Sequence, residues 1–233
     1  VAAEHGKEVC VAGFCGPAGD MAPNTLVNKS AEARMERLEG RTHTQELGHR
    51  IATAISEVLP VARKETAVDP SLAHVVKRLD LPTREVPEAE YTAAKKQIDA
   101  LNAKGDAITS REWRARNGLQ YIVDRYEAQK RGEGVYATEL HMLRLGDLAI
   151  ATNPFELYTD YGVQMLNRSP APQTVLIQLS GQMKDHGYYL PTADAIPRGS
   201  YSTDIRESVV GPEGGITDDE VAAITALGRP DGR

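Results

Sequence analysis

The spacing of apolar residues along the chain alternates between the pattern typical of a strand and the pattern typical of a helix. Residues 8–14 (EVCVAGF) form a short apolar run that predicts a buried strand, and the turn-rich loop CGPAGDMAPN follows it. Across residues 44–59 the apolar side chains recur at spacings of three and four, which predicts an amphipathic helix. Pro60 is expected to end that helix. Residues 61–81 are expected to be extended, with VARKETAV as an edge strand.

Two helices are predicted in the middle of the chain, at residues 88–104 and 110–131. Pro87 precedes the first helix and Gly105 follows it, which is the usual placement of these two residue types. Ser110 is the expected N-cap of the second helix. Both helices have surfaces rich in Arg, Lys and Glu. We therefore interpret residues 88–131 as a solvated helical hairpin inserted between strands of a sheet.

The second half of the chain returns to strand patterns. Residues 136–145 and 148–152 are predicted strands joined by a tight turn at Gly146 and Asp147. Residues 174–180 (TVLIQLS) are nearly all apolar or small, which is typical of a central strand.

Helices are expected to separate and follow these strands. A short one is predicted at residues 161–167, and a capping box opens another at residues 217–227. Alternating strands and helices predict the α/β class, as a layered domain with a mixed β-sheet flanked by helices. With no internal repeat or composition break, residues 1–233 are expected to form a single domain.

Composition narrows the possible partners. The 233 residues are 41% hydrophobic and 26% charged, an ordinary balance for a globular protein. A net charge of −6 without a block of Lys or Arg argues against a nucleic-acid partner. Cys10 and Cys15 would point to opposite faces of a continuous strand, so a bond between them is not expected. We interpret them as buried small apolar side chains.

Histidine motifs give little support to a metal site within this chain. The six histidines form neither HExxH nor HxH. His141, on a predicted strand, is interpreted as a structural histidine. The sequence thus contains no self-sufficient histidine metal site.

Carboxylates and phenols are the better candidates for chemistry. Glu156 follows an apolar strand and NPF, where it could be a metal ligand, a general base or a solvated glutamate at a helix start. Tyr189 could coordinate zinc, hydrogen-bond an oxyanion, or be a core or rim tyrosine. Asp20, in the glycine-containing loop, could orient a catalytic group or belong to an ordinary turn.

Four of these segments occur in the order expected of one family. They are GDMAPN at residues 19–24, PFE at 154–156, YLPT at 189–192 with Tyr201 downstream, and VGPEGG at 210–215. The ordered set resembles the catalytic domain of the neutral/alkaline, non-lysosomal ceramidases and their bacterial relatives. The resemblance extends to about Leu227 and covers only the second half of that catalytic domain. The chain is therefore expected to be the C-terminal half of a larger one.

The resemblance implies a zinc amidase. Glu156 and Tyr189 match two zinc ligands of the family, and two further histidine ligands are expected upstream of Val1. Tyr201 matches a tyrosine near the site, a candidate hydrogen-bond donor to the substrate carbonyl, and Asp20 would shape the catalytic site. The residues expected to contact substrate are Gly19, Ala22 and Tyr188.

One position departs from the family pattern. The ceramidases have Gly-Asp-Val-Ser-Pro-Asn with an active-site serine, whereas Ala22 has no hydroxyl group. Two hypotheses follow. The first is a zinc-dependent hydrolase that cleaves a ceramide-like N-acyl amide or related bond with metal-activated water. The second is a non-catalytic binding or structural protein of the same family.

The resemblance also carries expectations about substrate and location. It implies a small-molecule or lipid-like amide substrate, including one presented at a membrane surface. It further implies a secreted, periplasmic or cell-surface protein. The sequence makes no prediction of oligomeric state.

Overall fold

A computed structural model describes residues 12–64, 68–181, 188–212, 218, 222 and 223. The chain divides into two compact units. One, called here the helical unit, takes in Ala22–Ser71. The other, called here the sheet unit, takes in Cys15–Met21 and the residues from Leu72 onward. Each is described by itself.

The helical unit contains α2 (Lys29–Glu39) and α3 (His43–Ala62). Helix α3 begins with a capping box in which Thr42 and Gln45 each accept a backbone hydrogen bond from the other. The predicted stop at Pro60 is wrong, because the helix continues two residues further and Arg63 N–H still donates to the Leu59 carbonyl at 3.0 Å. Proline lacks only its own N–H donor, and the final turn tolerates that loss.

Residues 61–64 belong to the end of α3 and a turn, so the predicted edge strand does not begin there. Residues 65–67 of that segment lie outside the described residues. None of the α3 side chains is buried, although the sequence predicts an apolar stripe along this helix. The side chain of Ile51 is 64% exposed.

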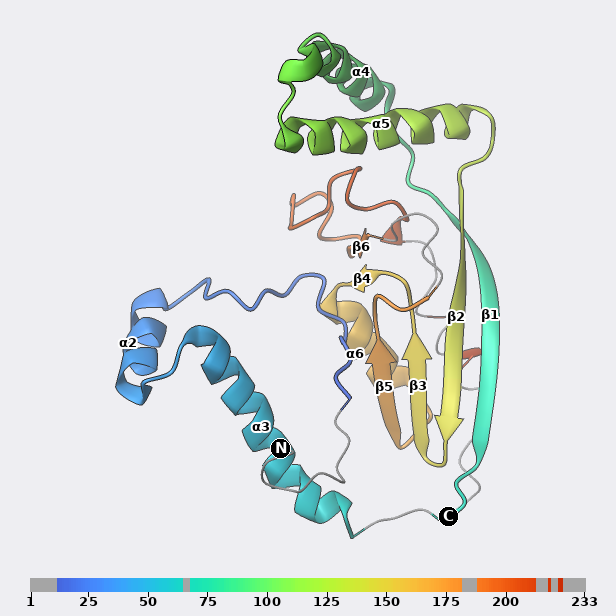
Figure 1. The fold of residues 1–233 in the computed structure, drawn as a ribbon. Helices are drawn as coiled ribbons and strands as arrows, with labels where there is room; N and C mark the ends of the chain where they lie inside the picture. The colour runs from blue at the N-terminus through green and yellow to red at the C-terminus, as the bar shows by residue number, and fades with distance from the viewer. Residues whose placement is uncertain (1–11, 65–67, 182–187, 213–217, 219–221, 224–233) are drawn as a thin grey trace. The chain divides into compact units, whose positions relative to one another are not determined.

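The sheet unit is built on a four-stranded mixed sheet with the order β1-β2-β3-β5 (Figure 1). β1 pairs with β2 and β2 with β3 in antiparallel register, and β3 pairs with β5 in parallel register. The predicted α/β class with a mixed sheet is confirmed. The strands are β1 (Leu72–Pro82), β2 (Val135–Leu145), β3 (Leu148–Thr152) and β5 (Gln173–Ile177).

Three expectations near the sheet need correction. Among the described residues β5 lies at an edge of the sheet rather than at its centre, and it is apolar because Leu176 packs into the core. Residues 12–14, the described part of the first predicted strand, are not in a strand. Cys15 is exposed rather than buried, while Cys10 lies outside the described residues. Most of the predicted helix at 217–227 also lies outside them.

A helical hairpin lies between β1 and β2 in the chain, formed by α4 (Glu88–Asn102) and α5 (Ser110–Lys130) (Figure 1). Both predicted helices are present, but the N-cap of α5 is Thr109 rather than Ser110. Thr109 N–H donates to the Glu112 carboxylate at 3.0 Å, and the Glu112 N–H returns a bond to the Thr109 hydroxyl at 3.3 Å. A small apolar cluster holds the hairpin together; its buried members are Val86, Ala94, Ile98, Ile122 and Val123.

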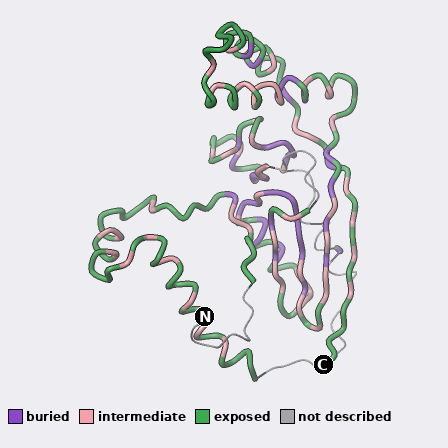
Figure 2. Tube along the Cα trace, in the orientation of Figure 1, coloured by how far each residue is buried: buried purple, intermediate pink, exposed green. Residues whose placement is uncertain are grey.

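The main core forms on one face of the sheet, where the short helix α6 (Thr159–Arg168) contributes Met165 (Figure 2). A second, two-stranded pairing lies beside it, between β4 (Glu156–Leu157) and β6 (Tyr189–Leu190). Leu157 and Leu190 are both buried in the main core. Because successive side chains of a strand point in opposite directions, Glu156 and Tyr189 share the side opposite to Leu157 and Leu190. Both are half-buried there, and Tyr189 still packs against the main core.

Candidate functional site

The parallel register of β4 and β6 places Glu156 directly beside Tyr189. Backbone bonds hold both strands, since Glu156 N–H donates to the Tyr188 carbonyl and Tyr189 N–H donates to the Glu207 carbonyl, each at 2.9 Å. The Tyr189 phenol is hydrogen-bonded to Glu156 and to Tyr201. Burial, these hydrogen bonds and the charge of Glu156 raise the pKa of Tyr189. Tyr189 is thus a neutral phenol next to a carboxylate.

Tyr201 reaches this pair from a loop that follows β6. Its ring meets that of Tyr189 edge-on, with the centroids 5.5 Å apart and the planes at 90°. The Tyr201 side chain is 69% exposed, so its hydroxyl is accessible to a ligand. The structure therefore brings together Glu156, Tyr189 and Tyr201, three residues that are up to 45 positions apart in the sequence.

Tyr158 is a residue that the sequence reasoning missed. Its hydroxyl donates a hydrogen bond to the backbone carbonyl of Tyr201, which anchors the loop. Burial, followed by the negative charge of Asp20, raises the pKa of Tyr158. No local pattern indicates this bond, because its two residues are 43 positions apart in the sequence.

Asp20 connects the glycine-containing loop to the start of α6. Its carboxylate accepts a bond from Thr159 N–H at 2.7 Å and another from the Thr159 hydroxyl at 3.0 Å. A carboxylate at a helix N-terminus also meets the positive end of the helix dipole. The geometry gives Asp20 the role of an anchor that orders the start of α6, one residue after Tyr158.

Gly19 lies against the backbone of β4. Its N–H donates to the Leu157 carbonyl at 2.6 Å, and a Cβ at this position would lie 2.4 Å from the Glu156 carbonyl oxygen. Only glycine allows so close a backbone approach. The buried amide of Gln178 reinforces the junction, because its oxygen accepts bonds from Leu157 N–H at 2.9 Å and Ala18 N–H at 3.3 Å.

Tyr188 and Ala22 are two further candidates from the sequence. The ring of Tyr188 packs toward Tyr121 of α5, with centroids 6.0 Å apart, and its φ of 53° is unusual for a bulky residue. Ala22 is exposed and opens the helical unit. Contact of Gly19, Ala22 or Tyr188 with a substrate stays a prediction.

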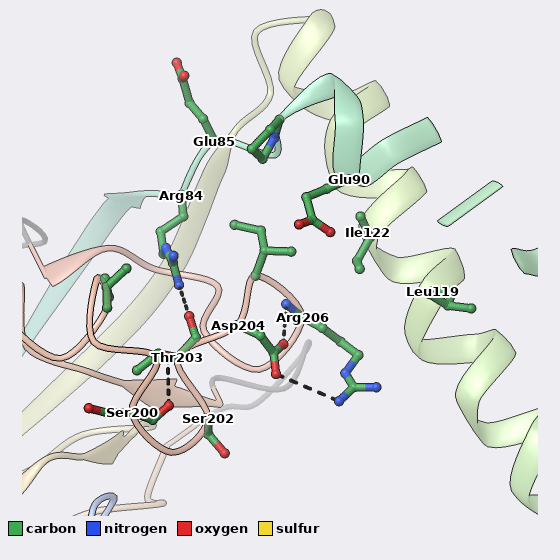
Figure 3. A pocket seen from close by; sticks show the side chains of 14 residues that line it. Arg84, Glu85, Glu90, Leu119, Ile122, Ser200, Ser202, Thr203, Asp204 and Arg206 are labelled. Carbon is green, nitrogen blue, oxygen red and sulfur yellow. Dashed lines mark hydrogen bonds and ion pairs between the residues drawn. The ribbon is translucent and has the colours of Figure 1, made fainter. Parts of the chain in front are cut away.

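A cavity of about 640 Å³ lies between the helical hairpin and the loop that carries Tyr201 (Figure 3). Leu119 and Ile122 of α5 supply apolar surface, and Glu90 of α4 extends toward the loop. The loop side is formed by residues on both sides of Tyr201. The sequence reasoning did not predict this cavity, because its two walls are about 80 residues apart in the chain and no local pattern links them.

Two arginines hold this loop through its backbone. Arg84 donates to the Thr203 carbonyl at 2.9 Å. The buried Arg125 donates to the carbonyls of Ile205, of Arg84 at 2.8 Å and of Val209 at 3.2 Å. Burial lowers the pKa of Arg125. Loop and hairpin are therefore joined by charge-assisted bonds.

The donor atoms at Glu156 and Tyr189 fit part of a zinc site. Carboxylate oxygen is an accepted zinc ligand, and a phenol can coordinate as the phenolate. Within the part of the chain that the structure describes, no group of three or more His, Cys, Asp or Glu side chains could hold a metal ion. Among these described residues, Glu156 and Tyr189 are two adjacent oxygen donors.

Comparisons with known proteins add little. No family model matches the chain, and no curated protein matches it. A solved structure of a ceramidase complexed with C2 is weakly similar, with 15% sequence identity and a TM-score of 0.32. That likeness covers 42% of this chain and 16% of the ceramidase chain. A likeness at this level does not establish a shared activity. None of the described helices has the length and apolar character needed to cross a bilayer.

Proposed function

We propose that this chain contributes two ligands, Glu156 and Tyr189, to the zinc centre of a hydrolase. The bond cleaved would be an amide, such as a ceramide-like N-acyl bond, or a related bond. Two histidines that precede Val1 in the complete protein would finish the ligand set. A secreted, periplasmic or cell-surface location stays a prediction.

The single observation that carries the proposal is the contact between the Glu156 carboxylate and the Tyr189 phenol, with Tyr201 against them. Both ligand candidates lie side by side because the parallel register of β4 and β6 pairs them. Burial, and then the hydrogen bonds and charge of Glu156, raise the pKa of Tyr189, whereas a bound divalent cation would favour the deprotonated phenol. Binding of zinc is therefore expected to release the phenol proton.

The residues around Glu156 and Tyr189 have distinct roles in this proposal. Zinc, when bound, would supply an activated water and polarise the scissile carbonyl. Tyr201 would donate a hydrogen bond to the carbonyl oxygen of the substrate, because its hydroxyl is exposed beside the ligand pair. Tyr158 would hold the Tyr201 backbone, and Asp20 would hold the start of α6. The cavity beside the loop offers apolar surface to the carbon chain of a lipid-like amide.

A second candidate function is a non-catalytic binding protein. Ala22 favours it, because alanine stands where the resembling family has its active-site serine. The hydrogen bond between Glu156 and Tyr189 would then be structural. The two candidates differ in one measurable property, which is the binding of zinc through Glu156.

The test is elemental analysis of zinc in a form of the protein that includes any residues preceding Val1. We expect about one zinc ion per chain, lost in Glu156→Ala and retained in the control Glu133→Gln. Glu133 is a suitable control because it is an exposed carboxylate paired with Arg131. Zinc addition should also produce tyrosinate absorbance that is missing in Tyr189→Phe. Zinc retained in full by Glu156→Ala would refute the proposal.

A further inference from the structure

Two histidines that are 67 residues apart in the sequence meet on the sheet. In the β1–β2 register, His141 is opposite Val76 and His74 is opposite Leu143, so the two are diagonal neighbours on one face. Their rings are stacked, with centroids 5.3 Å apart and planes at 15°. The His74 Nε2 and His141 Nδ1 atoms are 3.1 Å apart. Two imidazole nitrogens are therefore directed at each other.

This face is opposite to the main core. Leu140 and Met142 flank His141 on β2 and are fully buried, so the alternation of the strand turns His141 the other way. The side chain of His141 is 32% exposed, and His74 is exposed. Both rings can thus be reached from solvent in this chain, and His74 has room to change its rotamer.

A carboxylate lies behind the pair. Glu139, on the same face of β2, has an oxygen 3.9 Å from His141 Nε2. The Arg78 guanidinium holds the other oxygen of that carboxylate at 2.8 Å. Carboxylates behind the outer nitrogen of a metal-binding histidine orient the ring and increase its basicity. At 3.9 Å the carboxylate is too far from His141 for a direct hydrogen bond in this structure.

We infer that His74 and His141 form a binding site for a divalent transition metal ion. With metal–nitrogen bonds of 2.0–2.1 Å, two nitrogens are about 3.3 Å apart around a tetrahedral ion and about 2.9 Å apart as neighbours around a tetragonal ion such as Cu²⁺. The observed 3.1 Å lies between these two separations, so the rings need only a small shift together with a tilt that aims both lone pairs at one point. Cu²⁺ should bind most tightly, because imidazole sites follow the general order of divalent metal affinities.

Water would complete the coordination. The described residues offer no group of three His, Cys, Asp or Glu ligands here or elsewhere, so the protein contributes two nitrogens. This site does not depend on the proposed zinc centre, because it uses neither Glu156 nor Tyr189.

The experiment is a titration of the 233-residue chain with Cu²⁺, followed by calorimetry and by electron paramagnetic resonance. We expect a bound ion with two imidazole nitrogens. Either His74→Gln or His141→Gln should weaken that binding about a hundredfold, the low end of the gain from linking two binding groups. The double variant should lose binding at this site altogether, because it also removes the one imidazole that each single variant keeps.

Two controls separate this site from other metal-binding groups. His49→Gln removes an exposed histidine of α3 and should leave the titration unchanged. Glu156→Ala should also leave it unchanged, so failure of the zinc proposal would not affect this test. Circular dichroism would confirm that the histidine variants fold. Titrations of His74→Gln and His141→Gln that match the unmodified chain would overturn the inference, as would loss of the same binding in Glu156→Ala.

Discussion

Replacing Gly19 by alanine would place a methyl group where the backbone of β4 already lies. The added carbon would be 2.4 Å from the Glu156 carbonyl oxygen, 2.9 Å from its carbonyl carbon and 3.0 Å from the Leu157 carbonyl carbon. Ordinary van der Waals contact needs about 3.5–4.0 Å. All three neighbours are backbone atoms in a paired strand, so no side chain can rotate to relieve the overlap.

The loss of stability in Gly19→Ala follows from the contacts that the displaced loop would break. Shifting the loop breaks the 2.6 Å bond from Gly19 N–H to the Leu157 carbonyl, worth about 1 kcal/mol. Overpacking of a well-packed region adds about 1–3 kcal/mol. Together these predict a loss of about 2–4 kcal/mol in the free energy of unfolding. Asp20 should move with the loop and weaken its two bonds to Thr159.

Gly16→Ala is the matched control, because it lies on the same loop and its added Cβ would meet only the Leu176 carbonyl oxygen, at 3.9 Å. Both variants share the reduced entropy of the unfolded chain, which favours alanine by about 0.4–1 kcal/mol. The measurement is urea-induced unfolding, followed by circular dichroism and by fluorescence of Trp113 in the sheet unit. Equal midpoints for the two variants would refute the close-approach reasoning.

Other perturbations test the supports of the site and of the hairpin. Arg125→Met leaves three backbone carbonyls without their cationic donor and should lower stability by about 3 kcal/mol in urea unfolding; a loss below about 1 kcal/mol would contradict this. Because folding raises the pKa of Tyr189, the unfolded chain loses the phenol proton first, so stability should fall as pH rises above about 10. Tyr189→Phe should flatten that alkaline decline in urea midpoints, and an unchanged slope would count against it. The Lys104 side chain, then the Thr109 backbone, lower the pKa of Glu112 to about 2, so its contribution is present above the ordinary carboxyl pKa and is lost as the pH falls toward about 2. Helix content of Lys104→Met should depend less on acid pH than that of the unmodified chain, and parallel curves would exclude the Lys104–Glu112 ion pair as the cause.

The local sequence pattern predicted the secondary structure well where residues a few positions apart determine it. The hairpin helices, β2 and β3 lie within a residue or two of their predicted bounds, because their periodicity, caps and turn residues act over a few positions. Pro60 misled the prediction because its effect depends on how much helix remains after it. Thr109 was overlooked as a cap because two neighbouring residues, Thr and Ser, both suit that position.

Contacts between residues that are far apart in the sequence could not be predicted from the local pattern. Glu156 and Tyr189 were named from the sequence, but the register that joins β4 to β6 is set by the burial of Leu157 and Leu190 against distant core residues. The hydroxyl of Tyr158 on the Tyr201 carbonyl and the Gln178 amide between two backbone segments have no sequence motif. The hydrogen bonds from Arg125 to backbone carbonyls have no sequence motif either.

Residue chemistry and local period therefore come from the sequence alone: the α/β class, the helical hairpin, and a carboxylate and phenols suited to oxygen ligation. Tertiary structure decided which of these side chains meet. It placed β5 at an edge of the sheet, paired Glu156 with Tyr189, and brought His74 to His141 across two strands. The physical reason is that a side chain's own identity sets what it can bind, whereas its neighbours depend on strand register and burial summed over the whole core.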